Sequence, residues 1–286
     1  MKLGIFHQTR YDYESPVELN PHTLFLKPLQ RPHLRTSDHR LKISPVPKGL
    51  AERQSIEGNP FFQAWFSGQA DSLQIDSTFE VAVRPFNPFE FILDHDFIAR
   101  FDPQASKAFS YSEDDGILLH PALQTTVLPD LDAFAGTVLE RAPDEPIVFL
   151  KELTASIHEH WKHIIRTEEN LWSPAETFAA GEGSCRDLSW MMIHMLRMQG
   201  LGARFVSGYA YNPEIDEGHE LHAWVEVYLP GAGWLGVDPS LGLFADQYYI
   251  PLACSAHAHH TLPVHGNYGG TAGASLSTQL EITATP

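Results

Sequence analysis

The sequence predicts an α+β protein in two parts: an all-β, sandwich-like N-terminal domain, and a second domain in which helices pack on an antiparallel sheet. Three observations lead to this prediction. Short strand patterns bounded by Pro, Asn and Ser fill roughly the first 110 residues. Apolar residues recur at helical spacing between residues 144 and 200, and alternating patterns joined by a tight turn follow from residue 203. A helical run followed by an antiparallel run is typical of an α+β domain and not of a doubly wound sheet.

Composition narrows the class of protein before any motif is considered. The chain has 286 residues, enough for two domains, and its 43% apolar content lies in the globular range. A formal charge of −17 argues against a nucleic-acid or anionic-membrane partner, because both surfaces would repel it. No apolar run reaches about 18 residues and no export signal is seen, so we expect both cysteines to be reduced thiols in a cytoplasm. Nothing in the sequence indicates an oligomeric state.

The N-terminal domain is expected to cover residues 1–115. Its strand patterns are short and bounded by turn residues, and they include residues 11–14, 22–26 and 41–43. Residues 73–83 alternate apolar and polar side chains over one longer strand. Strands at this spacing favour an antiparallel sandwich or barrel. The aromatic run at residues 59–66 has two interpretations, ordinary core or an interface with the second domain.

The chain between the domains is expected to be a linker over residues 116–143. The charged run at residues 112–116 is typical of a surface segment, and several prolines punctuate the residues after it. The second domain then covers residues 144–286. Asp144 can cap a helix that has Pro146 in its first turn. The apolar stripe of that helix consists of Leu150, Leu153, Ile157, Trp161 and Ile164.

A second helix is expected to open at Ser184 and to stop at Gly200. Strands follow at residues 203–211, 221–229 and 234–238, with a Pro-Gly-Ala-Gly turn before the last of them. Residues 275–285 alternate again and predict a closing strand.

Cys185 falls at the start of the second helix, where a thiol is most easily ionised. Ser184 with Asp187 forms a capping-box pattern, so Cys185 lies in the first helical turn. Unpaired backbone N–H groups and the helix dipole stabilise a thiolate there, and with a neighbouring His⁺ they can lower a cysteine pKa from about 8.5 to roughly 3.5–7.5. Position alone does not separate such a nucleophile from a small buried apolar residue, the commonest fate of a free cysteine.

His222 and Asp238 lie on neighbouring strands of a predicted hairpin. Paired residues in an antiparallel hairpin have a constant sum of their numbers, and any even sum places these two side chains on one face, opposite or diagonal. Cross-strand neighbours at about 5–8 Å allow an Asp–His hydrogen bond. A helix-start cysteine, a strand histidine and an aspartate in the next strand together predict a thiol nucleophile, its base and the residue that orients the base.

At this point the sequence resembles a bacterial transglutaminase-like protein of the papain-like superfamily. The matching phrases are residues 183–188 (GSCRDL), 201–209 (LGARFVSGY), 222–234 (HAWVEVYLPGAGW) and Asp238-Pro239. The pattern Tyr11-x-Tyr13-x-x-Pro16-Val17 is similar to the opening of the β-rich N-terminal region of these proteins. The resemblance implies a papain-like core in which the helix carrying Cys185 packs on an antiparallel sheet.

The resemblance also implies roles for the three residues: Cys185 as nucleophile, His222 as general base and acid, and Asp238 as orienter of the imidazole. The implied reaction is acyl transfer on an amide or peptide through a thioester, hydrolytic in a peptidase or amidase and cross-linking in a transglutaminase. No cofactor follows from the sequence. Residues 171–178 differ from the usual sequence pattern of the family, so no oxyanion donor can be assigned there by resemblance. Backbone N–H groups near Cys185 are the candidates for this donor, with Trp172 as a further candidate.

Two other classes of function stay open. Cys254, His257, His259 and His260 offer soft and imidazole ligands for a metal, although their spacing matches no standard zinc pattern. A non-catalytic interaction protein could also keep a transglutaminase-like scaffold without its chemistry.

Overall fold

The computed structural model describes residues 1–142, 145–166, 168, 170–213 and 221–285. Its N-terminal part is all β and comprises β1 (Lys2–Leu19), β2 (His22–Leu24), β3 (Leu34–Ser44), β4 (Gly49–Gln54), β5 (Pro60–Trp65) and β6 (Gln69–Val83). Helices follow: α1 (His95–Ala99), α2 (Glu113–Leu118), α3 (His120–Leu123), α4 (Pro129–Arg141), α5 (Pro146–His160), α6 (Pro174–Ala180) and α7 (Cys185–Met198).

Short strands and a second sheet complete the chain. Around α6 lie β7 (Lys162–His163) and β8 (Glu182–Gly183). After α7 come β9 (Ala203–Ala210), β10 (Leu221–Leu229), β11 (Gly233–Asp238), β12 (Leu243–Phe244), β13 (Tyr249–Ser255), η1 (Ala258–Thr261), β14 (Val264–His265), β15 (Tyr268–Gly269) and β16 (Ala274–Thr285). Among the described residues, no helix combines the length and the apolar character needed to cross a bilayer.

The β-rich N-terminal region is a sandwich of two antiparallel sheets, which confirms the predicted fold class. One sheet has the order β15-β1-β6-β3 with β16 also on β1, and the other has the order β14-β2-β5-β4. The alternating pattern of β6 buries every second side chain, as the sequence predicts. Leu3, Ile5 and Leu73 of the first sheet pack in one apolar cluster with Leu24 and Phe62 of the second.

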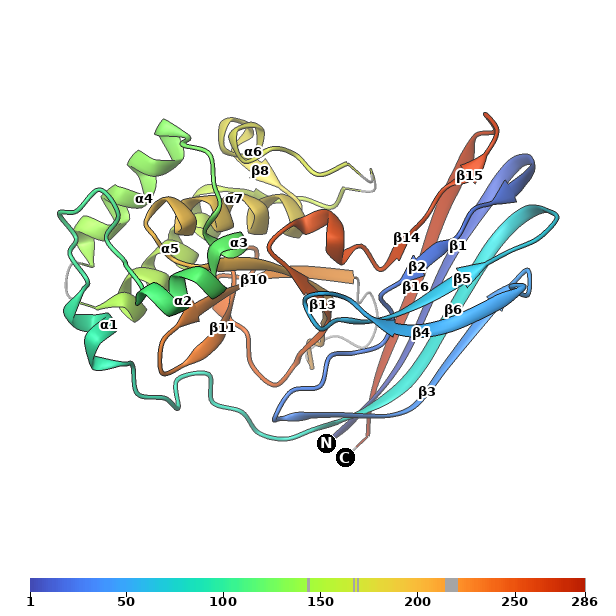
Figure 1. Cartoon of the computed structure of the whole chain (residues 1–286), viewed down its shortest axis with the longest axis horizontal. Coiled ribbons are helices and arrows are strands. Elements are labelled where there is room, and N and C mark those ends of the chain that lie inside the picture. The colour runs from blue at the N-terminus through green and yellow to red at the C-terminus, as the bar shows by residue number, and fades with distance from the viewer. Residues whose placement is uncertain (143–144, 167, 169, 214–220, 286) are drawn as a thin grey trace.

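The C-terminal tail returns to the N-terminal sheet (Figure 1). The predicted closing strand is present as β16, but it pairs along β1 from Lys2↔Thr285 to Tyr13↔Ala274 and does not extend the sheet of the second domain. Alternation in residues 275–285 predicts a strand and carries no information about its partner, because side-chain period is the same in any sheet. Both chain ends therefore lie together at one end of the sandwich in Figure 1.

The segment expected to be a linker over residues 116–143 is largely helical. Ser112 caps α2, since its hydroxyl accepts a hydrogen bond from the backbone N–H of Asp115 at 3.1 Å. The acidic residues that suggested a surface linker lie in the first turn of α2, where the helix dipole favours them. α4 buries Leu131, Ala135 and Val138 in the same cluster as α5 and α7, so it belongs to the core.

The two helices predicted in the second domain are confirmed, with shorter ends. α5 starts at Pro146 and ends at His160, so Ile164 lies beyond it, and the predicted cap Asp144 lies outside the described residues. α7 ends before Gly200, whose φ of +91° suits glycine. Of the apolar stripe predicted for the first of these helices, Leu150, Leu153, Ile157 and Trp161 are buried, whereas Ile164 is only half-buried.

The core sheet has the order β12-β11-β10-β9-β13, and α7 packs on one of its faces (Figure 1). The apolar side of β10 faces the helix, with Ala223, Val225 and Val227 in the same cluster as Met191 and Met195. This packing sets the N-terminus of α7 beside the start of β10. The structure thus has the predicted arrangement, a cysteine-bearing helix on an antiparallel sheet.

Candidate active site

Cys185 is the first residue of α7, as the capping-box pattern predicts, and its side chain is half-buried. The carboxylate of Asp187 accepts hydrogen bonds from the backbone N–H of Ser184 at 2.9 Å and from its hydroxyl at 2.6 Å. The helix therefore begins at a fixed point, and its first-turn N–H groups lie close to the thiol. A thiolate at this position is favoured by the helix dipole.

Asp187 also holds the chain segment that runs past the thiol. Arg166 donates to both of its oxygens at 2.9 and 2.8 Å, and the backbone N–H of Trp172 donates at 2.9 Å. Burial raises the pKa of Asp187, but hydrogen bonds from Ser184, Arg166 and Trp172 outweigh burial and lower it. The backbone N–H of Trp172 is therefore engaged, and its ring packs under the Arg166 guanidinium at 4.1 Å.

His222 and Asp238 meet across the hairpin of β10 and β11. Val225 pairs with Val237, so the numbers of paired residues sum to 462, one of the even registers that the sequence allows. The two side chains are diagonal neighbours on one face, and His222 Nε2 lies 2.6 Å from Asp238 Oδ2. The predicted juxtaposition is confirmed, and it leaves the other imidazole nitrogen free to act toward Cys185.

Asp238 is fully buried in a set of hydrogen-bond donors. Its Oδ1 accepts from the backbone N–H and the hydroxyl of Ser240 at 2.9 and 2.6 Å and from the N–H of Leu241 at 3.2 Å. Its Oδ2 accepts from the Tyr249 hydroxyl at 2.8 Å. Burial raises the pKa of Asp238, but the charge of His222 and these hydrogen bonds lower it, so the carboxylate stays ionised.

The thiol and the imidazole shift each other's ionisation. Burial raises the pKa of Cys185, but hydrogen bonds with His163 and His222, the charge of His222 and the backbone N–H of Ala223 lower it to about 6. Burial lowers the pKa of His222, but Asp238 and then Cys185 raise it to about 10. Near neutral pH the stable form is therefore a thiolate beside an imidazolium, the form in which a cysteine is nucleophilic.

His163 is a contact of the thiol that sequence reasoning missed. It lies on β7, which pairs in parallel with β8 so that His163 is opposite Gly183, two residues before Cys185. The ladder is closed by Lys162 N–H to Gly181 O and Ile164 N–H to Gly183 O, both at 3.0 Å. A two-residue strand has no periodicity to detect, and the helical pattern in this region extended past it, so no local signal could have found His163.

Ser240 and Tyr249 were also missed, for different reasons. Ser240 follows the Asp-Pro pair by one residue, and a hydroxyl two residues after an aspartate is a common partner of its carboxylate in turns, so the sequence did hold a signal. Tyr249 starts β13, on the far side of β9 from β10. Its contact with Asp238 depends on the strand order, which no local pattern reveals.

Cys254 lies in a different setting from Cys185. It is only 3% exposed, its sulfur lies 3.5 Å from Asn59 Oδ1, and burial raises its pKa. The rings of His257, His259 and His260 pack on one another with centroids 4.0–5.8 Å apart. Within the described part of the chain, no group of three or more His, Cys, Asp or Glu is arranged so that it could hold a metal ion.

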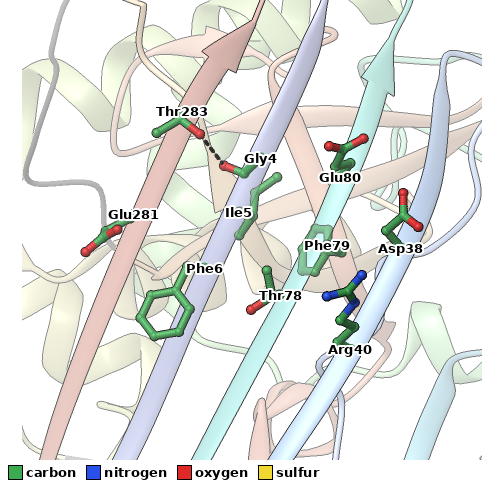
Figure 2. Close-up of a pocket in the computed structure, with 10 residues that line it drawn as sticks. All are labelled: Gly4, Ile5, Phe6, Asp38, Arg40, Thr78, Phe79, Glu80, Glu281 and Thr283. Carbon is green, nitrogen blue, oxygen red and sulfur yellow. Dashed lines mark hydrogen bonds between the residues drawn. The ribbon is translucent and has the colours of Figure 1, made fainter.

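The hollow shown in Figure 2 lies elsewhere, on the N-terminal sandwich. Its lining residues come from β1, β3, β6 and β16, and they include Phe6, Arg40 and Glu281. Among those lining residues there is no cysteine or histidine, and the hydroxyl of Thr283 donates to the carbonyl of Gly4 at 3.3 Å. The lining holds carboxylates and hydroxyls, but neither the thiol nor the imidazoles of the candidate site around Cys185.

Comparison with known proteins matches both parts of the chain. Residues 3–82 match the family model of the bacterial transglutaminase-like N-terminal region, and residues 135–239, which include all three candidate residues, match that of the transglutaminase-like superfamily. An uncharacterized protein of Mycobacterium tuberculosis is 26% identical over 264 residues, covering 86% of this chain and 81% of that protein. A protein-glutamine gamma-glutamyltransferase of Pseudomonas aeruginosa is 37% identical over 70 residues, only 22% of this chain and 10% of that protein.

The same fold occurs in a crystal structure from Cytophaga hutchinsonii, described as that of a candidate cysteine protease. It aligns with 100% of this chain and 92% of that chain, with a TM-score of 0.70 and 17% sequence identity. The likeness therefore covers the N-terminal sandwich as well as the core. The α+β class and the order of the two parts are shared.

Proposed function

Because this chain joins a bacterial transglutaminase-like N-terminal region to a transglutaminase-like core, we propose that it is a thiol-dependent acyl-transfer enzyme acting on amide or peptide bonds. Cys185 is the proposed nucleophile, His222 the general base and acid, and Asp238 the residue that orients His222. The observation that carries the proposal is the connected set of contacts from Asp238 through His222 to a thiol at a helix N-terminus. The proposed setting is the cytoplasm, since the nucleophile has to stay a reduced thiol.

The proposed reaction has two halves. The Cys185 thiolate forms a bond to the amide carbonyl carbon, and the carbonyl π electrons move to oxygen. When that intermediate collapses, the C–N bond breaks, the amine leaves with a proton from His222, and a thioester remains on Cys185. A second nucleophile, deprotonated by His222, then attacks the thioester and releases the thiolate. Asp238 stays ionised throughout and holds the imidazole in one tautomer and orientation.

We propose that the second nucleophile is water more often than an amine. The relative that spans this whole chain is described as a candidate cysteine protease, whereas the relative named as a transferase matches only 22% of the chain. The name of that transferase is what keeps an amine acceptor as the second candidate. Both outcomes use the same thioester, so they differ only in which molecule reaches it.

A screen of amide substrates tests the proposal and separates the two acceptors. Peptide, isopeptide and small-molecule amides are incubated with the whole chain, with and without an added primary amine, and products are identified by mass spectrometry. We expect released amine together with free acid, no turnover in Cys185→Ala, and unchanged turnover in Cys254→Ala. Products that persist in Cys185→Ala would show that the thiol is not the nucleophile, and an intact fold with no turnover of any substrate class would favour the non-catalytic scaffold.

A further inference from the structure

We propose that His163 is a further catalytic residue of this site, whose imidazole donates a hydrogen bond to the oxyanion formed when Cys185 attacks an amide carbonyl. The inference rests on the proposed acyl transfer. It names a side-chain donor to the oxyanion, whereas the sequence had indicated only backbone N–H groups and Trp172 as candidate donors.

The position of His163 is set by backbone structure. The parallel ladder of β7 and β8 places His163 opposite Gly183, and Ser184 alone separates Gly183 from the nucleophile. The thiol is therefore in contact with two imidazoles from different parts of the fold, His222 on β10 and His163 on β7. His163 is solvent-exposed while Asp238, the partner of His222, is fully buried, so the two rings approach the sulfur from unlike surroundings.

Attack of the thiolate on an amide carbonyl needs a hydrogen-bond donor to the oxyanion near the position of His163. As the sulfur–carbon bond forms, negative charge moves from sulfur to the carbonyl oxygen, which is one bond away from the carbon under attack. A group that donates to the resting thiolate is therefore within a short shift of the new oxyanion. The backbone N–H of Cys185, in the first turn of α7, can supply one donor. The imidazole of His163 can supply the second.

The two histidines have different roles in the proposed step: His222 transfers a proton, and His163 donates a hydrogen bond to the oxyanion. His222 is bonded through Nε2 to Asp238 and has to pass its proton to the leaving amine. A donor that gives up its proton cannot hold the oxyanion at the same moment. His163 keeps its proton in the proposed step, because it only donates a hydrogen bond while the C–O double bond opens and closes again. Trp172 cannot donate through its backbone N–H, since that group is bonded to Asp187.

Two substitutions at position 163 distinguish loss of the hydrogen-bond donor from the effect of any side-chain change at this exposed position. His163→Leu keeps the bulk and removes the donor, and His163→Gln keeps a side-chain N–H donor. With an amide that the wild-type chain turns over, we expect His163→Leu to lower kcat by about 10²–10³-fold with a small change in KM. His163→Gln should recover at least about tenfold of that loss, as a remaining donor requires. Lys162→Gln, on the same two-residue strand, is the matched control and should keep wild-type kcat.

A second readout distinguishes oxyanion binding from simple support of the thiolate. Alkylation of Cys185 by iodoacetamide at about pH 9, where the thiol is ionised, forms no oxyanion at the thiol's target carbon. We expect His163→Leu to change this alkylation rate by less than about threefold while turnover falls by the larger factor given above. Equal losses in alkylation and turnover would overturn the oxyanion role, and so would full activity in His163→Leu. Absence of amide turnover in the wild-type chain is a different failure, because it would remove the proposed function itself and this role with it.

Discussion

At the scale of single residues, two buried carboxylates, those of Asp187 and Asp238, are kept ionised by hydrogen bonds. Each carboxylate fixes the position of one half of the candidate site. Asp187 takes hydrogen bonds from Arg166, Ser184 and the backbone of Trp172, and this fixes where α7 begins. Asp238 takes hydrogen bonds from four residues, and this fixes the ring of His222. Buried charges are stable only when they are paired and hydrogen-bonded, so neither carboxylate can be replaced without a cost in geometry.

The orienting role of Asp238 leads to a prediction about kcat. In Asp238→Asn the amide can offer an N–H where the carboxylate offered an acceptor, which turns the imidazole to the wrong tautomer or orientation. We expect kcat to fall by about 10²–10⁴-fold while KM changes little. Steady-state kinetics on the best amide substrate measures this, with Asp71→Asn, at an exposed position on β6, as the control. An unchanged kcat in Asp238→Asn would show that Asp238 does not orient the base.

The shifted pKa values predict the pH dependence of turnover. Burial lowers the pKa of His222, but Asp238 and Cys185 raise it to about 10, so His222 is already protonated in the resting enzyme at neutral pH. The acid limb therefore belongs to Cys185, and activity should fall as the pH drops through about 6, where the thiolate gains a proton. Activity should fall again as the pH approaches 10, where the imidazolium loses its proton. A pH profile of kcat/KM in the wild-type chain tests both limbs, and an acid limb near the ordinary cysteine pKa of about 8.5 would contradict the pairing.

At the scale of elements, the close approach of β9, β10 and β13 sets His222 in place. Gly208 on β9 pairs with His222, and a Cβ at position 208 would lie 2.2 Å from the carbonyl oxygen of Ile250 and 2.8 Å from the ring of Trp224. The first of these atoms is backbone on β13, so it cannot rotate away. Only glycine lets the three strands meet at this point.

Gly208→Ala is therefore expected to push β13 away from β9 and to disturb the contact of Tyr249 with Asp238. Overpacking of this kind costs about 1–3 kcal/mol of unfolding free energy, and the displaced hydrogen bond should lower kcat as well. Urea denaturation and steady-state kinetics measure the two effects. Gly136→Ala, where an added Cβ meets open space on α4, is the control. Wild-type stability in Gly208→Ala would mean that the strands are not packed this closely.

Prediction from sequence succeeded at this scale where the signal was local. The capping box of Ser184 and Asp187 and the even register of His222 with Asp238 both depend on residues near one another in the chain. His163 was missed because its two-residue strand has no period. Tyr249 was missed because its place beside Asp238 depends on β13 joining the far edge of the sheet. Contacts of the latter two kinds are set by tertiary packing, which local patterns do not encode.

At the scale of the whole molecule, each part has its own apolar core, and the core of the sandwich extends onto the core sheet of the second part. Tyr209 and Ile250 of the core sheet lie in the same apolar cluster as Leu3 and Leu24 of the sandwich. The Tyr209 hydroxyl lies 2.8 Å from Nδ1 of His7, and both groups are buried. The chain also links the two parts, because after the core sheet it returns to the sandwich, where β16 pairs along β1 (Figure 1).

The apolar contact between the two parts predicts a single unfolding transition. Urea unfolding followed by tryptophan fluorescence and by far-ultraviolet circular dichroism should give coincident midpoints, because the sandwich cannot open without exposing Tyr209 and Ile250. Tyr209→Phe leaves Nδ1 of His7 without its partner, and we expect it to lower the unfolding free energy by about 1–3 kcal/mol in both signals. Two separated transitions, with only the later one affected by this change, would show that the parts fold independently.

The central claim is that Cys185 is an activated thiolate paired with His222, and the pH dependence of thiol alkylation tests it most directly. Rates for Cys185 and Cys254 are followed separately by mass spectrometry after brief exposure to iodoacetamide. We expect Cys185 to react much faster than Cys254 near neutral pH, with a midpoint near 6, and His222→Asn to move that midpoint upward. Equal and slow labelling of both cysteines in the folded wild-type chain would contradict the account.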